Sequence, residues 1–170
     1  LEAAGAIGFE DGLRLVQKRG ALMAEAPPGA MAAVIGMTEE RIRETLATND
    51  LDTIDVANLN APNQIILSGL KEDIERAAPI FESDSVRYLP LNTGGAFHSR
   101  YMKDARKAFE AVLAEFYFGR LAIPVISNVY AVPYAADADV AATLGAQITE
   151  PVQWAKSLRY ALAQGEDSFE

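Results

Sequence analysis

The stretch from Asn92 to Met102, NTGGAFHSRYM, contains the only histidine of the sequence, His98. A neutral imidazole has a pKa near neutrality, so it is the best candidate for a general base in such a loop. Residues 86–91 read as a strand and residues 101–116 as a helix, and α/β proteins often place reactive groups between such elements. The two adjacent glycines are expected to supply backbone angles for a tight turn. The alternative is a histidine that performs no chemistry in its loop.

The composition narrows the classes of function. There are 15 basic and 24 acidic residues, a net charge of -9, which argues against nucleic acid or an anionic membrane as the main partner. With no cysteine, the chain has no disulfide, thiol nucleophile or thiolate metal ligand, and with one histidine a zinc site is not expected. No apolar run is long enough for a membrane span, and the sequence does not begin as a signal peptide. These features predict a cytoplasmic protein.

The residues before His98 predict a helix and then a block in which strands and helices alternate. An apolar stripe predicts a helix over residues 9–26, which Pro27 and Pro28 end. Arg19 lies in its last third, where a cation usually contacts the helix dipole or faces solvent. The block that follows has the order βαββαβ of a small ferredoxin-like unit. Its predicted strands are 31–35, 54–58, 64–68 and 86–91, its helices 39–46 and 70–81, and residues 59–63 form a turn-rich loop.

The residues after His98 predict further elements. The helix over 101–116 is followed by a strand over 123–129, whose early proline suggests a strand start or an edge position. A helix is predicted over 138–147, and Pro151 is expected in the first turn of another that runs to Ala163. Residues 169–170 suggest the start of one more strand.

Six segments, in this order along the chain, carry a resemblance to a known family. They are GLRLVQKRGALM (12–23), GAMAAVIG (29–36), NLNAPNQ (58–64), GAFHS (95–99), IPVISNV (123–129) and QITEPVQW (147–154). The chain resembles malonyl-CoA:acyl-carrier-protein transacylases and the acyltransferase domains of polyketide synthases over essentially all 170 residues. The segment FHSRYM (97–102) is most similar to the stand-alone, trans-acting acyltransferases of polyketide assembly lines.

The resemblance implies an α/β fold. Residues 1–28 and 94–170 would form part of an α/β-hydrolase-like large subdomain, and residues 29–93 an inserted ferredoxin-like βαββαβ small subdomain. The chain departs from the family in one respect, because it lacks the Gly-His-Ser-Leu-Gly segment that carries the nucleophilic serine. That segment is expected upstream of Leu1, so the printed chain alone is expected to be inactive.

The resemblance also implies roles for particular residues. His98 would be the catalytic base of a ping-pong transfer through an acyl-serine, oriented by the backbone carbonyl of Gln147. Arg19 would bind the free carboxylate of malonyl, and Phe97 would favour malonyl over branched methylmalonyl. Asn58 and Asn60 would lie near the substrate tunnel, although turn chemistry explains these asparagines almost as well.

The implied ligands are coenzyme A thioesters and a carrier protein. Malonyl-CoA would be the substrate and a phosphopantetheinylated acyl carrier protein the acceptor, with no permanently bound cofactor and no metal. Arg100, Lys103 and Lys107 share one face of the helix after His98, with Arg106 beside it. This face is either solvated or a docking surface for these anionic ligands.

Two other functions stay open at this point. A relative could hydrolyse acyl groups from carrier proteins, but a hydrolase that clears monocarboxylic groups has no need of Arg19. The chain could instead be a non-catalytic binding module with a ferredoxin-like core. A Gly-x-Ser-x-Gly segment upstream of Leu1 would distinguish an enzyme from such a module.

Overall fold

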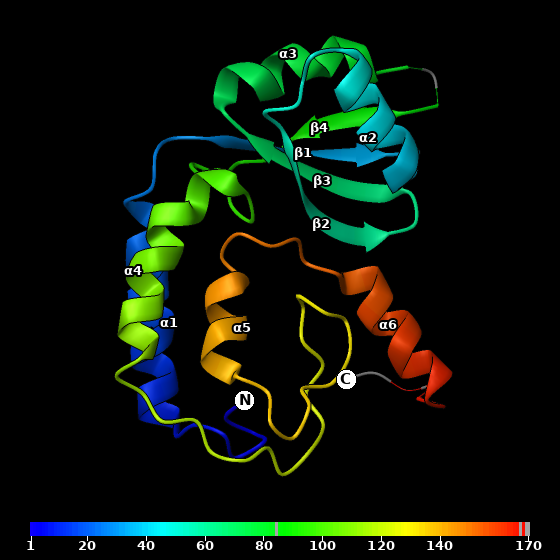
Figure 1. Ribbon diagram of the computed structural model, residues 1–170. Helices are drawn as coiled ribbons and strands as arrows, with labels where there is room; N and C mark the ends of the chain where they lie inside the picture. The colour runs from blue at the N-terminus through cyan, green and yellow to red at the C-terminus, as the bar shows by residue number, and fades with distance from the viewer. Residues whose placement is uncertain (84, 167, 169–170) are drawn as a thin grey trace.

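The computed structural model describes residues 1–83, 85–166 and 168. Figure 1 shows a small sheet with two helices against it, and a second part of helices and long loops beside it. Residues 169–170, where the sequence suggests a new strand, lie outside the described residues. Within the described part of the chain, no helix is both long and apolar enough to cross a membrane.

The sheet has four antiparallel strands in the order β2-β3-β1-β4. Its strands are β1 (Ala30–Ile35), β2 (Asp55–Ala61), β3 (Gln64–Gly69) and β4 (Arg87–Pro90). The helices α2 (Glu39–Thr48) and α3 (Lys71–Phe81) lie on one face (Figure 1). The predicted order of strands and helices in this block is confirmed.

Successive side chains of a strand point to opposite faces of the sheet. In β1 and β3 both faces are buried, whereas in β4 only Tyr88 is buried. Ala32 and Val34 of β1 pack with the residues of α2 and α3. Met31 and Ala33, on the opposite face, pack in a smaller cluster against Phe97. The residue before His98 therefore contacts the sheet directly.

The end of the second strand in the block differs from the prediction. Residues 59–61, predicted as loop, continue β2, because Leu59 is buried and Ala61 pairs with Gln64. The β2–β3 turn is therefore only Pro62 and Asn63. Pro79 lies inside α3, which ends two residues later at Phe81. Thr38, a residue type favoured at helix N-caps, caps α2, since its hydroxyl accepts a hydrogen bond from the backbone NH of Arg41.

The second part contains α1 (Phe9–Ala24), α4 (Lys103–Leu113), α5 (Val140–Ala146) and α6 (Trp154–Ala163). Helices α1 and α4 lie side by side, α5 packs on α4, and α6 packs on β2 (Figure 1). Met102, Phe109 and Leu113 are buried between them, together with Leu15 and Met23 of α1. This core fixes the helix that follows His98.

Three predicted elements of this part are wrong in detail. The helix over 101–116 is a short 3-10 turn, η1 (Arg100–Met102), followed by the shorter α4. Residues 123–129 form no strand and make only an isolated bridge between Ile126 and Pro133, because no described strand lies beside them. Pro151 lies before α6 and not in its first turn, because Val152 pairs with β2 in an extended conformation.

The apolar stripe of α1 is only partly buried. Leu15 and Met23 face the core, whereas Phe9 is 70% exposed and Val16 is 68% exposed. Leu13, another apolar residue of α1, is 49% exposed. The face of α1 that carries Phe9, Leu13 and Val16 instead lines a cavity that reaches His98.

Candidate functional site

The loop between β4 and η1 holds His98 in an unusual backbone conformation. His98 has a φ of 55°, in the left-handed region that few residues other than glycine adopt. Gly94 and Gly95 do not have positive φ angles, so the expectation that they supply such angles is wrong. Gly95 leaves space for the Phe97 ring instead, because a Cβ there would lie 2.8 Å from the ring, which would then have to shift.

The loop is also packed tightly from outside. A Cβ at Gly29 would lie 2.6 Å from Ala96, and the Gly29 backbone NH donates to the Gly94 carbonyl. Inside the loop, the buried hydroxyl of Ser99 donates to the Ala96 carbonyl at 2.5 Å and accepts from the Tyr101 backbone NH. These contacts fix the backbone on both sides of His98.

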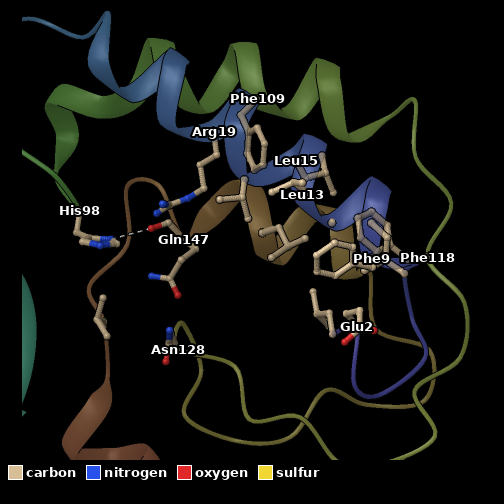
Figure 2. A pocket seen from close by; sticks show the side chains of 16 residues that line it. Glu2, Phe9, Leu13, Leu15, Arg19, His98, Phe109, Phe118, Asn128 and Gln147 are labelled. Atoms are coloured by element: carbon tan, nitrogen blue, oxygen red, sulfur yellow. Dashed lines mark hydrogen bonds between the residues drawn. The ribbon is translucent and has the colours of Figure 1, made fainter.

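His98 makes one hydrogen bond that defines its chemistry. Its Nδ1 lies 2.9 Å from the backbone carbonyl oxygen of Gln147, at the C-terminal end of α5 (Figure 2). A carbonyl can only accept, so Nδ1 carries the proton and Nε2 of the neutral ring is an acceptor. That is the form a general base requires.

The surroundings keep this imidazole neutral. Burial lowers the pKa of His98, the hydrogen bond to Gln147 raises it, and the charge of Arg19 lowers it further. The net direction is below the usual value. Near neutral pH the ring is therefore mostly unprotonated and able to accept a proton.

Arg19 projects from α1 towards the same region as His98 (Figure 2). Its guanidinium is half-buried, and burial lowers the pKa of Arg19 from its usual value, although an arginine stays charged in a protein. It makes no ion pair or side-chain hydrogen bond within the described part of the chain. A charge in such a position favours an anionic ligand, because burial without a partner is costly.

A cavity of about 450 Å³ lies between α1, β1, β2 and the His98 loop. It brings together four of the predicted site residues, Arg19, Asn58, Phe97 and His98. Asn60 lines neither this cavity nor the larger one described next. Met23 and Met31 also line it, and the sequence indicated only core positions for them, because a methionine at helical or strand spacing looks the same in both roles.

A larger cavity, of about 720 Å³, extends from His98 along α1. Figure 2 shows Arg19, His98 and Gln147 at one end and Phe9, Leu13 and Phe118 at the other. Asn128 also lines it, near the Gln147 side chain. Asn128 lies within the strand predicted over 123–129, and no local sequence signal distinguishes it as a cavity residue.

The described residues contain no nucleophile aligned with His98. The neighbouring hydroxyl of Ser99 is buried and occupied by two hydrogen bonds. Ser68, Ser127 and Ser157 are buried and line neither cavity. No group of three or more acidic, cysteine or histidine side chains in the described part of the chain could hold a metal.

A family model and a curated relative both identify this chain as similar to acyltransferases. Residues 1–169 match the family described as the acyl transferase domain. The chain is 50% identical to the polyketide biosynthesis malonyl CoA-acyl carrier protein transacylase BaeC of Bacillus velezensis, over 100% of this chain and 59% of the relative. The chain thus spans somewhat more than half the length of such relatives.

Solved structures extend the likeness to three dimensions. The malonyl CoA-acyl carrier protein transacylase of Burkholderia pseudomallei superimposes with a TM-score of 0.93 at 47% identity, over 96% of this chain and 56% of that one. A malonyl-transacylase, PlMCAT, solved in complex with the acyl carrier protein AntF of a type II polyketide synthase, matches with a TM-score of 0.88. It is 32% identical over 97% of this chain and 55% of that one.

Proposed function

Because the chain belongs to the acyl transferase domain family, we propose that it forms the general-base and acyl-binding part of a malonyl-CoA:acyl carrier protein transacylase of polyketide or fatty acid synthesis. The observation that carries this proposal is the convergence of two groups on one site. His98, oriented by the Gln147 carbonyl, lines the same cavities as the guanidinium of Arg19, which has no ion-pair partner among the described residues. A base and a carboxylate receptor side by side suit a substrate that has both a thioester and a free carboxylate.

The nucleophile in this proposal is a serine outside the 170 residues, since the chain contains no Gly-x-Ser-x-Gly segment. His98 Nε2 accepts the proton of that serine as its oxygen attacks the thioester carbon of malonyl-CoA. When the tetrahedral intermediate collapses, the C–S bond breaks and the imidazolium returns the proton to the sulfur of coenzyme A. The pantetheine thiol of a carrier protein then attacks the acyl-serine by the same steps in reverse order.

Arg19 gives this reaction its preference for a dicarboxylic acyl group. A planar guanidinium can hold a carboxylate through two parallel hydrogen bonds, and its half-buried position strengthens them. Phe97 forms a wall of the smaller cavity beside His98 and packs on the sheet, so it limits branching next to the thioester carbonyl. Asn58 lies on the same wall, whereas Asn60 can affect the substrate only indirectly.

We also propose that the two parts of the fold are the two subdomains of this family. Residues 29–93 would be a ferredoxin-like small subdomain, and its support is the antiparallel order β2-β3-β1-β4 with both helices on one face. Residues 1–28 and 94–170 would belong to an α/β-hydrolase-like large subdomain. The apolar cavity wall on α1 is consistent with further secondary structure of that subdomain packing there.

The test uses the complete enzyme, meaning this chain together with the segment that supplies the serine. The enzyme is mixed with malonyl-CoA and a phosphopantetheinylated carrier protein, and mass spectrometry follows the acyl-enzyme, the malonyl-carrier and free malonate. Transfer of malonyl to the carrier is expected. Free malonate as the main product would support a hydrolase instead, and no acyl-enzyme at all would contradict the proposal.

A further inference from the structure

The loop of His98 is tied to the sheet by an ion pair between Arg100 and Asp55. Asp55, the first residue of β2, accepts a hydrogen bond from the Arg100 backbone NH at 2.8 Å. It also accepts from the guanidinium, with Nε at 3.0 Å and the terminal nitrogen at 2.6 Å. A backbone bond and a forked side-chain contact on one carboxylate define the position of residue 100 more strictly than a single surface ion pair does.

The next residue adds a second tie to the same region. The hydroxyl of Tyr101 donates to the Thr53 carbonyl at 2.9 Å. The Thr53 hydroxyl in turn donates to Asp73 of α3 at 2.7 Å. The residues two and three positions after His98 are therefore both fixed to the strand start and to the helix behind it.

Strand β2 also holds the other partner of the His98 hydrogen bond. The Val152 backbone NH donates to the Ala57 carbonyl at 2.8 Å, and the Leu59 NH donates to the Val152 carbonyl at 2.9 Å. Val152 lies five residues after Gln147, whose carbonyl accepts from His98. One edge strand thus supports the imidazole from one side and its acceptor carbonyl from the other.

We propose that Asp55 and Arg100 are a positioning pair, which holds the His98 imidazole in register with the Gln147 carbonyl through the backbone of residues 98–100. Neither side chain lines the cavities, so neither touches the substrate. The need for such a pair follows from the left-handed backbone of His98, which persists only where its surroundings fix it. The inference rests on the proposed function for its consequence in catalysis, and on geometry alone for its effect on the imidazole.

The prediction for catalysis is a fall in turnover without a matching loss of binding. Asp55→Ala removes the acceptor for both parts of Arg100, and a small displacement of a base can lower the rate by about 10–100-fold. We expect that loss in kcat for acyl-enzyme formation in the complete enzyme, with the KM for malonyl-CoA little changed. Arg100→Lys keeps the charge but loses the fork, and should give an intermediate loss.

The prediction for the imidazole is independent of catalysis. In the enzyme labelled with ¹⁵N-histidine, the His98 signals are assigned by their absence in His98→Gln. The wild type should show a protonated Nδ1 and an unprotonated Nε2. Asp55→Ala should show a mixture of the two neutral tautomers, because the hydrogen bond to Gln147 is no longer fixed.

The matched control is Glu39→Gln on α2. It removes the charge from another forked ion pair, in which Arg43 donates to Glu39 at 2.9 and 3.0 Å, on the face of the sheet opposite to Phe97. It should leave both the kcat and the tautomer as in the wild type. If Asp55→Ala does not fold, Asp55→Asn and Arg100→Lys carry the same test, because Asn keeps the shape of the Asp55 side chain and Lys keeps the charge at position 100.

Two results separate this inference from the proposed function. A wild-type tautomer and a wild-type kcat in the Asp55 and Arg100 variants would overturn the positioning pair. If His98→Gln acylates at the wild-type rate, the proposed function fails, whereas a changed tautomer in Asp55→Ala would still support the pair.

Discussion

Arg19 and His98 line both cavities of the site, and the positive charge of Arg19 lowers the pKa of His98. The residue proposed to bind the substrate carboxylate therefore also acts on the proposed base. A bound malonyl carboxylate would offset the charge of Arg19 and make the imidazole more basic when the substrate is in place. In the proposed enzyme, substrate recognition and the strength of the base would thus be coupled electrostatically.

The proposed base can be tested by comparing His98 with its hydrogen-bond partner. In the complete enzyme, His98→Ala should slow acyl-enzyme formation by about 10²–10⁴-fold, the usual effect of losing a general base. Gln147→Ala is the matched control, because only the backbone carbonyl of Gln147 contacts His98. Its rate should change by less than about tenfold. Rapid-quench mass spectrometry measures both rates, and equal losses in the two variants would argue for a structural effect.

The carboxylate contact of Arg19 should appear as a change in donor preference. Arg19→Ala should cost about 1.5–3 kcal/mol for malonyl-CoA, the usual contribution of a hydrogen bond to a charged group. That is a loss of roughly 10–150-fold in kcat/KM, whereas acetyl-CoA should be used as well as before or better. The exposed neighbour Lys18, changed to Ala, is the control. Similar losses for both donors in Arg19→Ala would indicate a folding defect.

The pH dependence of acylation should reflect the lowered pKa of His98. The base must be neutral, so the rate should rise with pH through the pKa of His98, below the usual value of about 6.5. Arg19→Gln removes a positive charge, which should raise that pKa and move the rise to higher pH. Acetyl-CoA is the donor for this measurement, so that the carboxylate contact does not enter. An unchanged profile in Arg19→Gln would show that the charge of Arg19 does not contribute to the lowered pKa of His98.

The basic face of the helix after His98 is smaller than the sequence suggests. Arg100 is bound to Asp55, and Arg106 contacts Glu110, Glu150 and Thr149. Only Lys103 and Lys107 remain exposed and without an ion pair within the described part of the chain. These two lysines, five and nine residues after His98, are the part of the face that could attract the proposed acidic carrier protein.

Charge reversal of this lysine pair should slow association with the carrier protein. Lys103→Glu with Lys107→Glu should raise the KM for the carrier at low salt, and the difference should shrink as salt screens the charges. Self-acylation by malonyl-CoA should change less. The control is Arg43→Glu with Lys71→Glu, which reverses the charge of one residue on each helix that covers the small sheet. It changes the net charge by the same amount. The same rise in KM for both double variants would leave the lysine pair without a specific role.

The sequence predicted the small sheet better than the second part of the fold. The strands and helices from β1 to β4 follow local periodicity, and their pairing completes a core of their own. Residues 123–129 carry the composition of a strand, but a strand needs a neighbour, and no described segment provides one. The start of α6 was predicted too early because the pairing of Val152 with β2, a contact distant in sequence, overrides the helical preference of residues 151–153.

The sequence indicates which residues form the candidate site, but not the backbone conformation and contacts that hold them in place. The nearness of His98 to Arg19 and the carbonyl of Gln147 followed from resemblance, because these residues lie far apart along the chain. The left-handed backbone of His98 could not be predicted, since the glycines beside it suggested that they would take that role. The pairing of Arg100 with Asp55 joins residues 45 positions apart, and no local pattern indicates it.

The pairing of Val152 with β2 has a consequence for the behaviour of the protein in solution. β2 is an edge strand, and an exposed edge offers unpaired backbone groups on which another chain can add as a further strand. Val152 occupies those groups at Ala57 and Leu59, and α6 lies against the same strand. At the opposite edge, β4 has only four residues and ends in Pro90, which cannot donate a backbone hydrogen bond. The sheet is thereby protected at both edges from self-association into larger β-aggregates.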